Sequence, residues 1–291
     1  MTNSQTGQQA KIKIAIIGAG KVGQSLKQLF ELDQHQVTLV GRDIAAHKDQ
    51  INQAQLVLIT TTDSQIKAVC DSISPYLQAS TVVSHCSGAL NSNVLNSAKQ
   101  KGCNIASSHP LNTFPSLDAA LTTFANTEHG TYLYCEGDKA ALELITTVFK
   151  PSGFAVVEID SKAKTAYHTA CVFACNYLTV LMDLSLQTAE LKGIDKALFS
   201  TAIQPLIQAT LSNINTHGTT ASLSGPIARG DSTTVNQHID LLEKESPTIA
   251  NAYVLLAQHA LQLAEQQGQL SHTKLEQLES ILKPSEPKTD Q

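Results

Sequence analysis

The first half of the chain alternates short apolar runs with segments of helical periodicity. Between the first two runs, Val22, Leu26, Leu29 and Phe30 recur at the spacing of one helix face. The apolar runs, which have the length of β-strands, cover residues 11–17, 36–40, 55–60, 81–84, 104–107, 131–135 and 155–159, and a further helical stretch covers 138–149. Strands that alternate with crossover helices predict an α/β fold with a doubly wound, mostly parallel sheet.

Beyond residue 160 the pattern changes, and no further strand is indicated. Apolar residues at helical spacing predict helices at 161–192 and 195–213, one that begins after Asp231, one at 247–267, and a last one from Ser271. Asp195, Asp231 and Ser246 stand where N-caps are expected, and Gly193 stands just past a helix end. We therefore expect an α/β domain over 11–159 and an all-helical domain over 160–283, between flexible tails at 1–10 and 284–291.

Charge and composition narrow the classes of function. Charged residues make up 15% of the 291 residues, against roughly 25% in an average protein, and the net charge is −5. Nucleic-acid binding needs concentrated Lys and Arg, so we expect no nucleic-acid partner. No stretch approaches the roughly 18 uninterrupted apolar residues of a membrane span, and the polar N-terminus lacks the apolar core of a signal peptide. The six cysteines form no CxxC pair. We expect reduced thiols and a cytoplasmic protein without a membrane partner.

A glycine-rich segment follows the first strand directly. Gly18, Gly20 and Gly23 form the pattern GxGxxG, with Lys21 and Val22 between the last two glycines. Between a strand and an amphipathic helix this pattern is typical of dinucleotide binding, because the glycines allow a tight turn and a close approach of the pyrophosphate. The N–H groups that open the helix bind the phosphates. We predict that these five residues bind a dinucleotide; the alternative is a glycine-rich turn without a ligand.

The end of the second strand indicates which dinucleotide binds. NAD sites usually place Asp or Glu there to bind the ribose 2′-hydroxyl, whereas a nearby Arg suits the 2′-phosphate of NADP. Here Gly41 occupies the position of the acid and Arg42 follows it, which favours NADP over NAD. In the alternative interpretation, Arg42 is a solvated loop residue and Asp43 binds the ribose.

Polar segments also follow the third and fourth strands. The carboxyl ends of parallel strands line the cofactor cleft in open α/β sheets. We therefore predict cofactor contacts from Thr60, Thr61, Thr62, Asp63, His85 and Ser87. Alternatively, Asp63 and Ser84 cap the helices that follow.

Four motifs resemble those of a bacterial family of Rossmann-like proteins whose C-terminal helical domain has no assigned function. They lie at 84–88 (SHCSG), 109–115 (HPLNTFP), 164–168 (KTAYH) and 224–231 (SGPIARGD). The glycine-rich start also resembles pyrroline-5-carboxylate reductases, ketopantoate reductases and β-hydroxyacid dehydrogenases. The resemblance covers about 11–283. It implies a Rossmann-like dinucleotide-binding domain, an all-helical C-terminal domain and a homodimer formed through that domain, but no substrate.

Lys164 and His168 lie four residues apart and share a helix face. β-Hydroxyacid dehydrogenases carry a catalytic Lys followed four residues later by a substrate-orienting Asn, so the resemblance implies acid–base catalysis by Lys164. His168 replaces the Asn and could orient substrate or transfer protons itself. His109, expected in a loop at a strand end, is a third catalytic candidate, and Asn176 is a candidate substrate contact. The alternatives are a solvated Lys164 and a His109 that only holds its loop.

The segment 224–234 opens a helix and carries Arg229, Asp231 and Thr234. It resembles the segment by which pyrroline-5-carboxylate reductases grip the substrate carboxylate, which implies that these three residues bind substrate. A helix N-terminus with an adjacent Arg suits an anion. In the alternative interpretation, Asp231 caps the helix and pairs with Arg229.

Metal binding is disfavoured. His168, Cys171 and Cys175 fall on one helix face, but no fourth ligand lies nearby in the sequence, and structural zinc sites need four. We expect cysteines buried in a helix interface and no metal.

Together these features predict an NADP-dependent oxidoreductase that transfers a hydride to or from a small molecule, with carboxylate-bearing substrates among the candidates. The alternative is a non-catalytic NADP-binding dimer with a regulatory or redox-sensing role.

Overall fold

The computed structural model describes residues 11–114 and 131–283. Contacts divide the chain into two compact units, Met1–Ala174 and Cys175–Gln291. The sequence pattern changes near residue 160, where the last strand ends. The division by contacts falls later, after Ala174, so the start of the helix that follows the last strand belongs to the sheet unit. The tails expected to be flexible, 1–10 and 284–291, lie outside the described residues.

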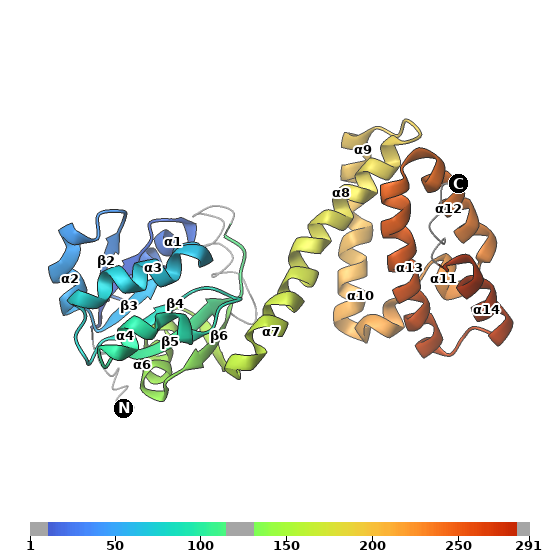
Figure 1. Ribbon diagram of the computed structural model, residues 1–291. Helices are drawn as coiled ribbons and strands as arrows, with labels where there is room; N and C mark the ends of the chain where they lie inside the picture. The colour runs from blue at the N-terminus through green and yellow to red at the C-terminus, as the bar shows by residue number, and fades with distance from the viewer. Residues whose placement is uncertain (1–10, 115–130, 284–291) are drawn as a thin grey trace, which may run out of the picture. The chain divides into compact units, whose positions relative to one another are not determined.

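The sheet unit is built on seven strands in the order β2-β1-β3-β4-β5-β6-β7. Figure 1 labels β2 to β6. Neighbouring strands pair in parallel except β5 and β6, which are antiparallel. The strands are β1 (Lys13–Ile17), β2 (Gln36–Val40), β3 (Leu56–Ile59), β4 (Val82–His85), β5 (Asn104–Pro110), β6 (Thr131–Gly137) and β7 (Phe154–Glu158). The predicted α/β fold with a mostly parallel sheet is confirmed.

Helices cover both faces of the sheet, because successive strand residues point to opposite sides. On one face, Ile14 belongs to a buried cluster with Phe30 and Phe149, whose rings meet edge to face at 4.9 Å. On the other face, Ile17 clusters with Ile66. The helices are α1 (Lys21–Leu32) and α6 (Lys139–Phe149) on the first face, and α2 (Lys48–Gln53), α3 (Asp63–Ile73) and α4 (Asn96–Gln100) on the second. Short 3₁₀ turns occur at Ala45–His47, Ser74–Tyr76 and Ser92–Leu95.

One helical stretch follows β7. A 3₁₀ turn (Ser161–Ala163) leads into α7 (Lys164–Cys171), a π-helical turn (Val172–Asn176) and α8 (Tyr177–Glu190). The helix predicted at 161–192 agrees with this stretch, although the π turn interrupts it. Gly193 follows with a φ of 78°, a left-handed conformation that glycine adopts without strain.

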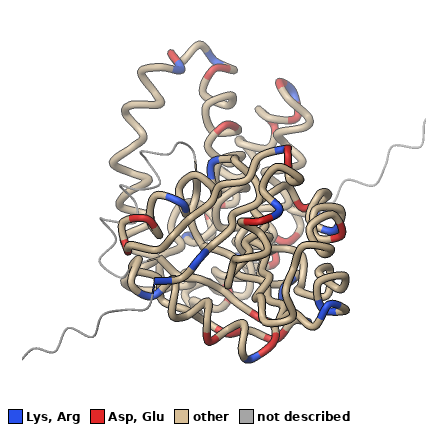
Figure 2. Tube along the Cα trace, turned by 90° about the vertical axis from the view of Figure 1, so that its left-hand side faces the viewer, with Lys and Arg blue, Asp and Glu red and all other residues tan. Residues whose placement is uncertain are grey.

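The distribution of charged and apolar residues in the described parts of the chain bears on two expectations, that the protein has no nucleic-acid partner and no membrane span. Lys and Arg are interspersed with Asp and Glu along the trace (Figure 2). The helical stretch Ser161–Glu190 is long and apolar enough to cross a membrane by length and composition alone, since it contains an 18-residue window with a mean hydropathy of 1.5. The criterion of an uninterrupted apolar run does not detect it, because polar residues such as Thr179 and Asp183 interrupt the pattern. Exposed apolar surface of this kind also marks interfaces between proteins.

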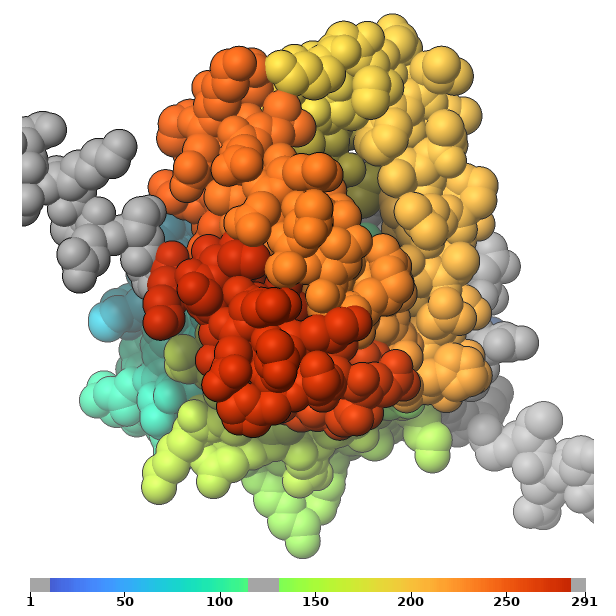
Figure 3. All heavy atoms as spheres, turned by 90° about the vertical axis from the view of Figure 1, so that its right-hand side faces the viewer, coloured from blue at the N-terminus to red at the C-terminus, as the bar shows by residue number. Residues whose placement is uncertain are grey.

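Over its described residues 175–283 the second unit contains helices and no strand. After α8 it comprises α9 (Lys196–Ala202), α10 (Gln204–Ser222), α11 (Pro226–Arg229), α12 (Ser232–Glu245), α13 (Pro247–Gln267) and α14 (His272–Ile281), most of which are visible in Figure 3. Buried Val235, Leu261 and Leu278 belong to one apolar cluster that joins α12, α13 and α14. This cluster forms the core of the helical unit.

One predicted helix of this unit is wrong. The single helix at 195–213 is instead α9 followed by α10, because Pro205 in the first turn of α10 lacks the N–H that continuation of a helix requires. Ser246 occupies the N-cap position of α13 as predicted, although its side chain makes no capping hydrogen bond. The caps predicted at Asp195 and Asp231 are confirmed, since both carboxylates accept hydrogen bonds from first-turn N–H groups.

Candidate functional site

In the glycine-rich loop between β1 and α1, the middle glycine, Gly20, has free space on the side where a side chain would lie. Gly18 has a φ of 123°, and a Cβ there would lie 2.9 Å from Thr60 Oγ1. A Cβ on Gly23 would collide with the carbonyl oxygen of Gly18. By contrast, no atom lies within 4 Å of the position that a Cβ on Gly20 would occupy. The backbone at Gly20 is therefore accessible to a ligand, as pyrophosphate binding requires.

Helix α1 begins directly after this glycine and has no side-chain cap. The N–H groups of its first turn and the positive end of its dipole therefore suit an anion. Lys21 is exposed at the first helical position. Val22 packs its side chain against the core, so its backbone is the part that faces a ligand.

A cleft of about 580 Å³ opens beside the loop. Its lining includes Gly18 and Gly20 of the loop, Gly41 and Arg42 after β2, and Thr61 after β3. The hydroxyl of Thr61 is buried and has no hydrogen-bond partner among the described residues. An unsatisfied buried hydroxyl is costly, so a ligand that bonds to it is favoured. The open backbone, the cation and this hydroxyl fit a dinucleotide.

Arg42 is exposed in this cleft, whereas Asp43 is engaged in the turn after β2. Asp43 Oδ1 accepts a hydrogen bond of 3.1 Å from Ala46 N. An Asp at such a turn commonly bonds to a backbone N–H a few residues on. The geometry therefore favours Arg42, rather than Asp43, as the residue that recognises the adenosine ribose.

The polar residues at the strand ends have distinct local roles. Thr60 Oγ1 donates a hydrogen bond of 2.8 Å to the carbonyl oxygen of the first glycine and so holds the loop. Thr62 occupies the N-cap position of α3 without a capping hydrogen bond, and Asp63 is the first residue of that helix. Ser84 lies buried within β4, with its hydroxyl 2.8 Å from that of Ser108. The interpretation of Asp63 and Ser84 as side-chain caps is therefore wrong.

His85 and Ser87 shape the loop after β4. His85 is fully buried; its Nδ1 accepts a hydrogen bond of 3.2 Å from Ser87 N, and its Nε2 donates one of 3.1 Å to the Asn91 carbonyl oxygen. Burial lowers the pKa of His85 to about 4, so the ring is neutral near neutral pH. Ser87 Oγ accepts hydrogen bonds from the N–H groups of Ala89 and Leu90. Both side chains are thus engaged within the protein, and their predicted contact with the cofactor stays a prediction.

Lys164, at the start of α7, is 1% exposed. Its Nζ donates hydrogen bonds of 2.9 Å to the carbonyl oxygen of Ser87 and to Ser107 Oγ. Burial lowers the pKa of Lys164, and the carboxylate of Glu136 partly opposes this shift. The interpretation of Lys164 as a solvated helix residue is therefore wrong. Its ammonium group connects α7 to β5 and to the loop after β4.

His109, Tyr167 and His168 converge beside Gly88. His109 Nδ1 lies 2.8 Å from the hydroxyl of Tyr167, and the rings of His109 and His168 meet edge to face at 6.1 Å. Tyr134 stacks on Tyr167 at 4.4 Å. A Cβ on Gly88 would lie 2.5 Å from His168 Nδ1 and 3.1 Å from His109 Nε2. His168 Nδ1 is buried without a hydrogen-bond partner among the described residues.

The expectation that His109 lies in a loop is wrong. It belongs to β5, opposite Tyr134, because antiparallel pairing with β6 extends the strand through Pro110. Burial, together with the positive charge of Lys164, lowers the pKa of His109 to about 4. No local sequence signal singles out Tyr167, although the motif KTAYH contains it. Its role depends on a contact with β5 that only the fold creates.

The remaining predicted site residues belong to the helical unit. Asn176 is exposed at the end of the π-helical turn. The carbonyl oxygen of exposed Arg229 accepts a hydrogen bond of 2.9 Å from Lys274 Nζ. Asp231 accepts hydrogen bonds from Thr234 N at 3.0 Å and Thr234 Oγ1 at 2.7 Å, which lower the pKa of the carboxyl group. Asp231 and Thr234 thus act as an N-cap, and no ion pair joins Asp231 to Arg229 within the described part of the chain.

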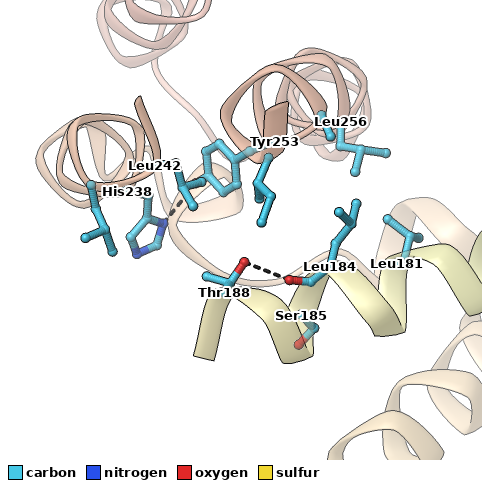
Figure 4. Close-up of a pocket in the computed structure, with 11 residues that line it drawn as sticks. Leu181, Leu184, Ser185, Thr188, His238, Leu242, Tyr253 and Leu256 are labelled. Carbon is cyan, nitrogen blue, oxygen red and sulfur yellow. Dashed lines mark hydrogen bonds between the residues drawn. The ribbon is translucent and has the colours of Figure 1, made fainter. Parts of the chain in front are cut away.

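An apolar pocket of about 350 Å³ lies within the helical unit between α8, α12 and α13 (Figure 4). Leu184, Leu242 and Leu256 contribute to its lining, one from each helix. The lining also includes His238, whose Nδ1 lies 2.9 Å from the hydroxyl of Tyr253. None of the predicted site residues lines this pocket.

Part of the sequence and the fold find counterparts among known proteins. Residues 131–260 match the family described as a domain of unknown function (DUF2520). The comparison with curated proteins finds no match.

Solved structures share the fold over most of the chain. Protein TM1727 from Thermotoga maritima has a TM-score of 0.67 at 23% identity, covering 88% of this chain and 100% of that one. Protein BF3122 from Bacteroides fragilis has a TM-score of 0.67 at 18% identity, with 87% and 98% covered. Plasmodium falciparum pyrroline carboxylate reductase, with NADP bound, has a TM-score of 0.55 at 15% identity, with 87% and 100% covered. The resemblance to Rossmann-like proteins with a C-terminal helical domain of unassigned function is thereby confirmed.

Proposed function

We propose that this protein is an NADP-dependent oxidoreductase. The observation that carries the proposal is the cleft where the open backbone of Gly20, the uncapped start of α1 and exposed Arg42 lie together. The first two suit a pyrophosphate and the third suits a 2′-phosphate. The NADP bound to the pyrroline carboxylate reductase of similar fold supports NADP over NAD.

The catalytic groups proposed for the reaction belong to the sheet unit. NADPH, when bound, supplies a hydride from its nicotinamide ring. His109, Tyr167 and His168 gather at the carboxyl ends of β4 and β5, the edge where open α/β sheets bind their ligands. Lys164 holds the loop after β4 in place. Substrate contacts from Asn176 and Arg229 stay a prediction.

Thermal-shift titrations with NADPH and NADH test the cofactor. A ligand that binds only the folded state stabilises it by about 2.7 kcal/mol at a concentration of 100 Kd. We expect a larger shift with NADPH than with NADH. Arg42→Ala should reduce the NADPH shift and leave the NADH shift unchanged, and Lys48→Ala, which removes an exposed cation outside the cleft lining, is the matched control.

The outcomes separate the two functional candidates. No shift with either nucleotide contradicts nucleotide binding, and equal shifts contradict the choice of NADP. A protein that binds NADPH but reduces neither carbonyl nor imine compounds supports the alternative, a regulatory or redox-sensing NADP-binding dimer.

We also propose that the protein forms a homodimer through its helical unit and acts in the cytoplasm. Large apolar side chains are exposed on α8, α9 and α10, with Val180 at 50%, Leu198 at 69% and Leu206 at 62%. Exposed apolar surface of this kind marks protein interfaces. All six cysteines are free, as thiols in a reducing compartment are.

Light scattering on the purified chain tests the dimer. We expect twice the mass of one chain without detergent, and a shift toward monomer in Leu206→Glu. Leu32→Glu is the matched control, because Leu32 is 76% exposed but lies in the sheet unit. A monomeric wild-type chain contradicts the dimer, and a chain that is soluble only in detergent points to a membrane partner instead.

A further inference from the structure

The Tyr167 hydroxyl group determines which nitrogen of His109 carries a proton. The two groups lie 2.8 Å apart, through His109 Nδ1. Burial raises the pKa of Tyr167, while burial and the charge of Lys164 lower that of His109 to about 4. Near neutral pH the phenol is therefore protonated and the imidazole neutral. Because the imidazole lone pair is a better acceptor than the phenol oxygen, Tyr167 donates to Nδ1, and the proton of His109 is on Nε2.

The resulting Nε2–H of His109 is a donor without a fixed acceptor. It lies on the edge of the ring beside Gly88, where a Cβ would be 3.1 Å from Nε2. Within residues 11–114 and 131–283, Nδ1 is the His109 ring nitrogen that has a hydrogen-bond partner. The N–H is therefore positioned to bind an acceptor atom of a ligand at the end of β5.

The charges around His109 disfavour a cation. Lys164 and His168 on α7 and His85 on β4 all act to lower its pKa, whereas Asp63 on α3 acts in the opposite direction. The carboxylate of Glu136 acts on Lys164 and is not among the groups that shift the pKa of His109. Among the described residues that act on His109, Asp63 is therefore the carboxylate that opposes the positive groups, and the cluster offers mainly N–H donors and positive charge.

We infer that the reducible group of the substrate is a neutral carbonyl, whose oxygen accepts a hydrogen bond from His109 Nε2–H, and that Tyr167 is the positioning residue for this donor. The inference rests on the proposed oxidoreductase function. A carbonyl oxygen has lone pairs for the N–H, whereas a protonated imine has none at nitrogen and would be repelled by the charge of Lys164.

For a carbonyl substrate, the proposed reaction joins hydride addition at carbon to protonation at oxygen. The carbonyl carbon gains a hydride with its electron pair, the π pair of the C=O bond moves to oxygen, and oxygen takes a proton from water. The carbonyl is reduced to an alcohol while the dihydronicotinamide is oxidised. His109 Nε2–H stabilises the negative charge that develops on oxygen.

Nitrogen NMR on the full chain labelled with [¹⁵N]histidine tests the donor without any substrate. Long-range ¹H–¹⁵N correlations distinguish the two neutral tautomers from the protonated ring, and the spectrum of His109→Gln assigns the signal. We expect His109 to be a single Nε2–H tautomer between about pH 6 and 8. Tyr167→Phe should give a mixture of both tautomers. Tyr134→Phe, which removes a hydroxyl from the ring stacked on Tyr167, is the matched control and should leave the tautomer unchanged.

A His109 that carries its proton on Nδ1, or that is protonated at neutral pH, overturns the inference whether or not the protein is an oxidoreductase. The same holds if Tyr167→Phe leaves the single Nε2–H tautomer intact.

Assays of NADPH oxidation by the protein with two sets of candidate substrates test the substrate class. The first set contains ketones, aldehydes and 2-oxo acids. The second set contains cyclic imines that are protonated at the assay pH. We expect turnover of carbonyl compounds, and in Tyr167→Phe a kcat lower by about tenfold or more with an unchanged KM for NADPH. Reduction of imines alone contradicts the carbonyl inference and leaves the proposed function standing. Absence of turnover in a protein that binds NADPH contradicts both, and failure to bind NADPH contradicts the proposed function first.

Discussion

Lys164 Nζ donates a hydrogen bond of 2.9 Å to the carbonyl oxygen of Ser87. Because Gly88 follows Ser87 and lies against both imidazoles, this bond sets the distance between the loop and the rings of His109 and His168. A buried ammonium with no ion-pair partner among the described residues is unfavourable for folding alone. Its presence is therefore better explained by the geometry of the site than by stability.

The lowered pKa of Lys164 predicts a pH-dependent difference from Lys164→Met. In the unfolded chain a lysine binds its proton up to about pH 10.5, whereas the buried lysine releases it at a lower pH. Between these two values the unfolded state binds more protons, so the stability of the wild type rises with pH relative to the variant. Urea denaturation from neutral pH to pH 10 measures this difference.

Lys162→Met is the control for this experiment, because Lys162 is exposed two residues earlier in the same segment. Its free energy of unfolding should follow that of the wild type at every pH. A constant difference between wild type and Lys164→Met across the range would show that the pKa of Lys164 is unshifted.

The lowered pKa of His85 predicts that the folded protein loses stability in acid. Its pKa is about 4 in the folded protein, where burial disfavours the charged ring, and 6.5 is the ordinary value. As pH falls from 6.5 to 4 the unfolded state takes up the proton first, and the folded state loses about 3 kcal/mol of relative stability. The free energy of unfolding of His85→Gln should fall less over this range, by urea denaturation. A slope equal to that of the wild type would show that His85 titrates normally.

The cap at Asp231 predicts a local stability effect. Its carboxylate accepts two hydrogen bonds from Thr234, so Asp231→Ala should lower the free energy of unfolding measurably. Asp231→Asn should recover most of the loss, because an amide oxygen still accepts the N–H bond. Asp240→Ala, at an exposed position of the same helix, should change little. If chemical denaturation gives Asp231→Ala and Asp240→Ala the same free energy of unfolding, the capping role of Asp231 is contradicted.

The sheet could be predicted from the sequence because its signals are local. Apolar runs of strand length, glycines at fixed spacing and an amphipathic helix each show within about a dozen residues. The break at Pro205 is equally local, since a proline cannot donate the helical hydrogen bond, and the helix prediction at 195–213 overlooked it. The glycine-rich loop and Arg42 followed from the same short-range reasoning.

The arrangement of the histidine cluster could not be predicted in this way. The hydrogen bond between His109 and Tyr167 joins residues that are 58 positions apart. Pro110 favours a loop at His109, but pairing with β6 extends the strand past it. Nothing in the local sequence distinguishes buried Lys164 from exposed Lys162; the difference appears only when α7 packs onto β5.

Substitution by alanine should have different effects at Gly20 and Gly23, on NADPH binding at the first and on stability at the second. Gly23→Ala places a Cβ into the carbonyl oxygen of Gly18, which Thr60 holds in place, so the fold should lose about 1–3 kcal/mol. Gly20→Ala meets no atom within 4 Å, and its φ of −75° is available to any residue. Its stability should stay within about 0.5 kcal/mol of the wild type. The new methyl group nevertheless occupies the approach of the pyrophosphate, so the thermal shift with NADPH should shrink. Thermal melting of both variants with and without NADPH separates the effects. A Gly20→Ala protein that responds to NADPH like the wild type would show that the phosphates bind elsewhere.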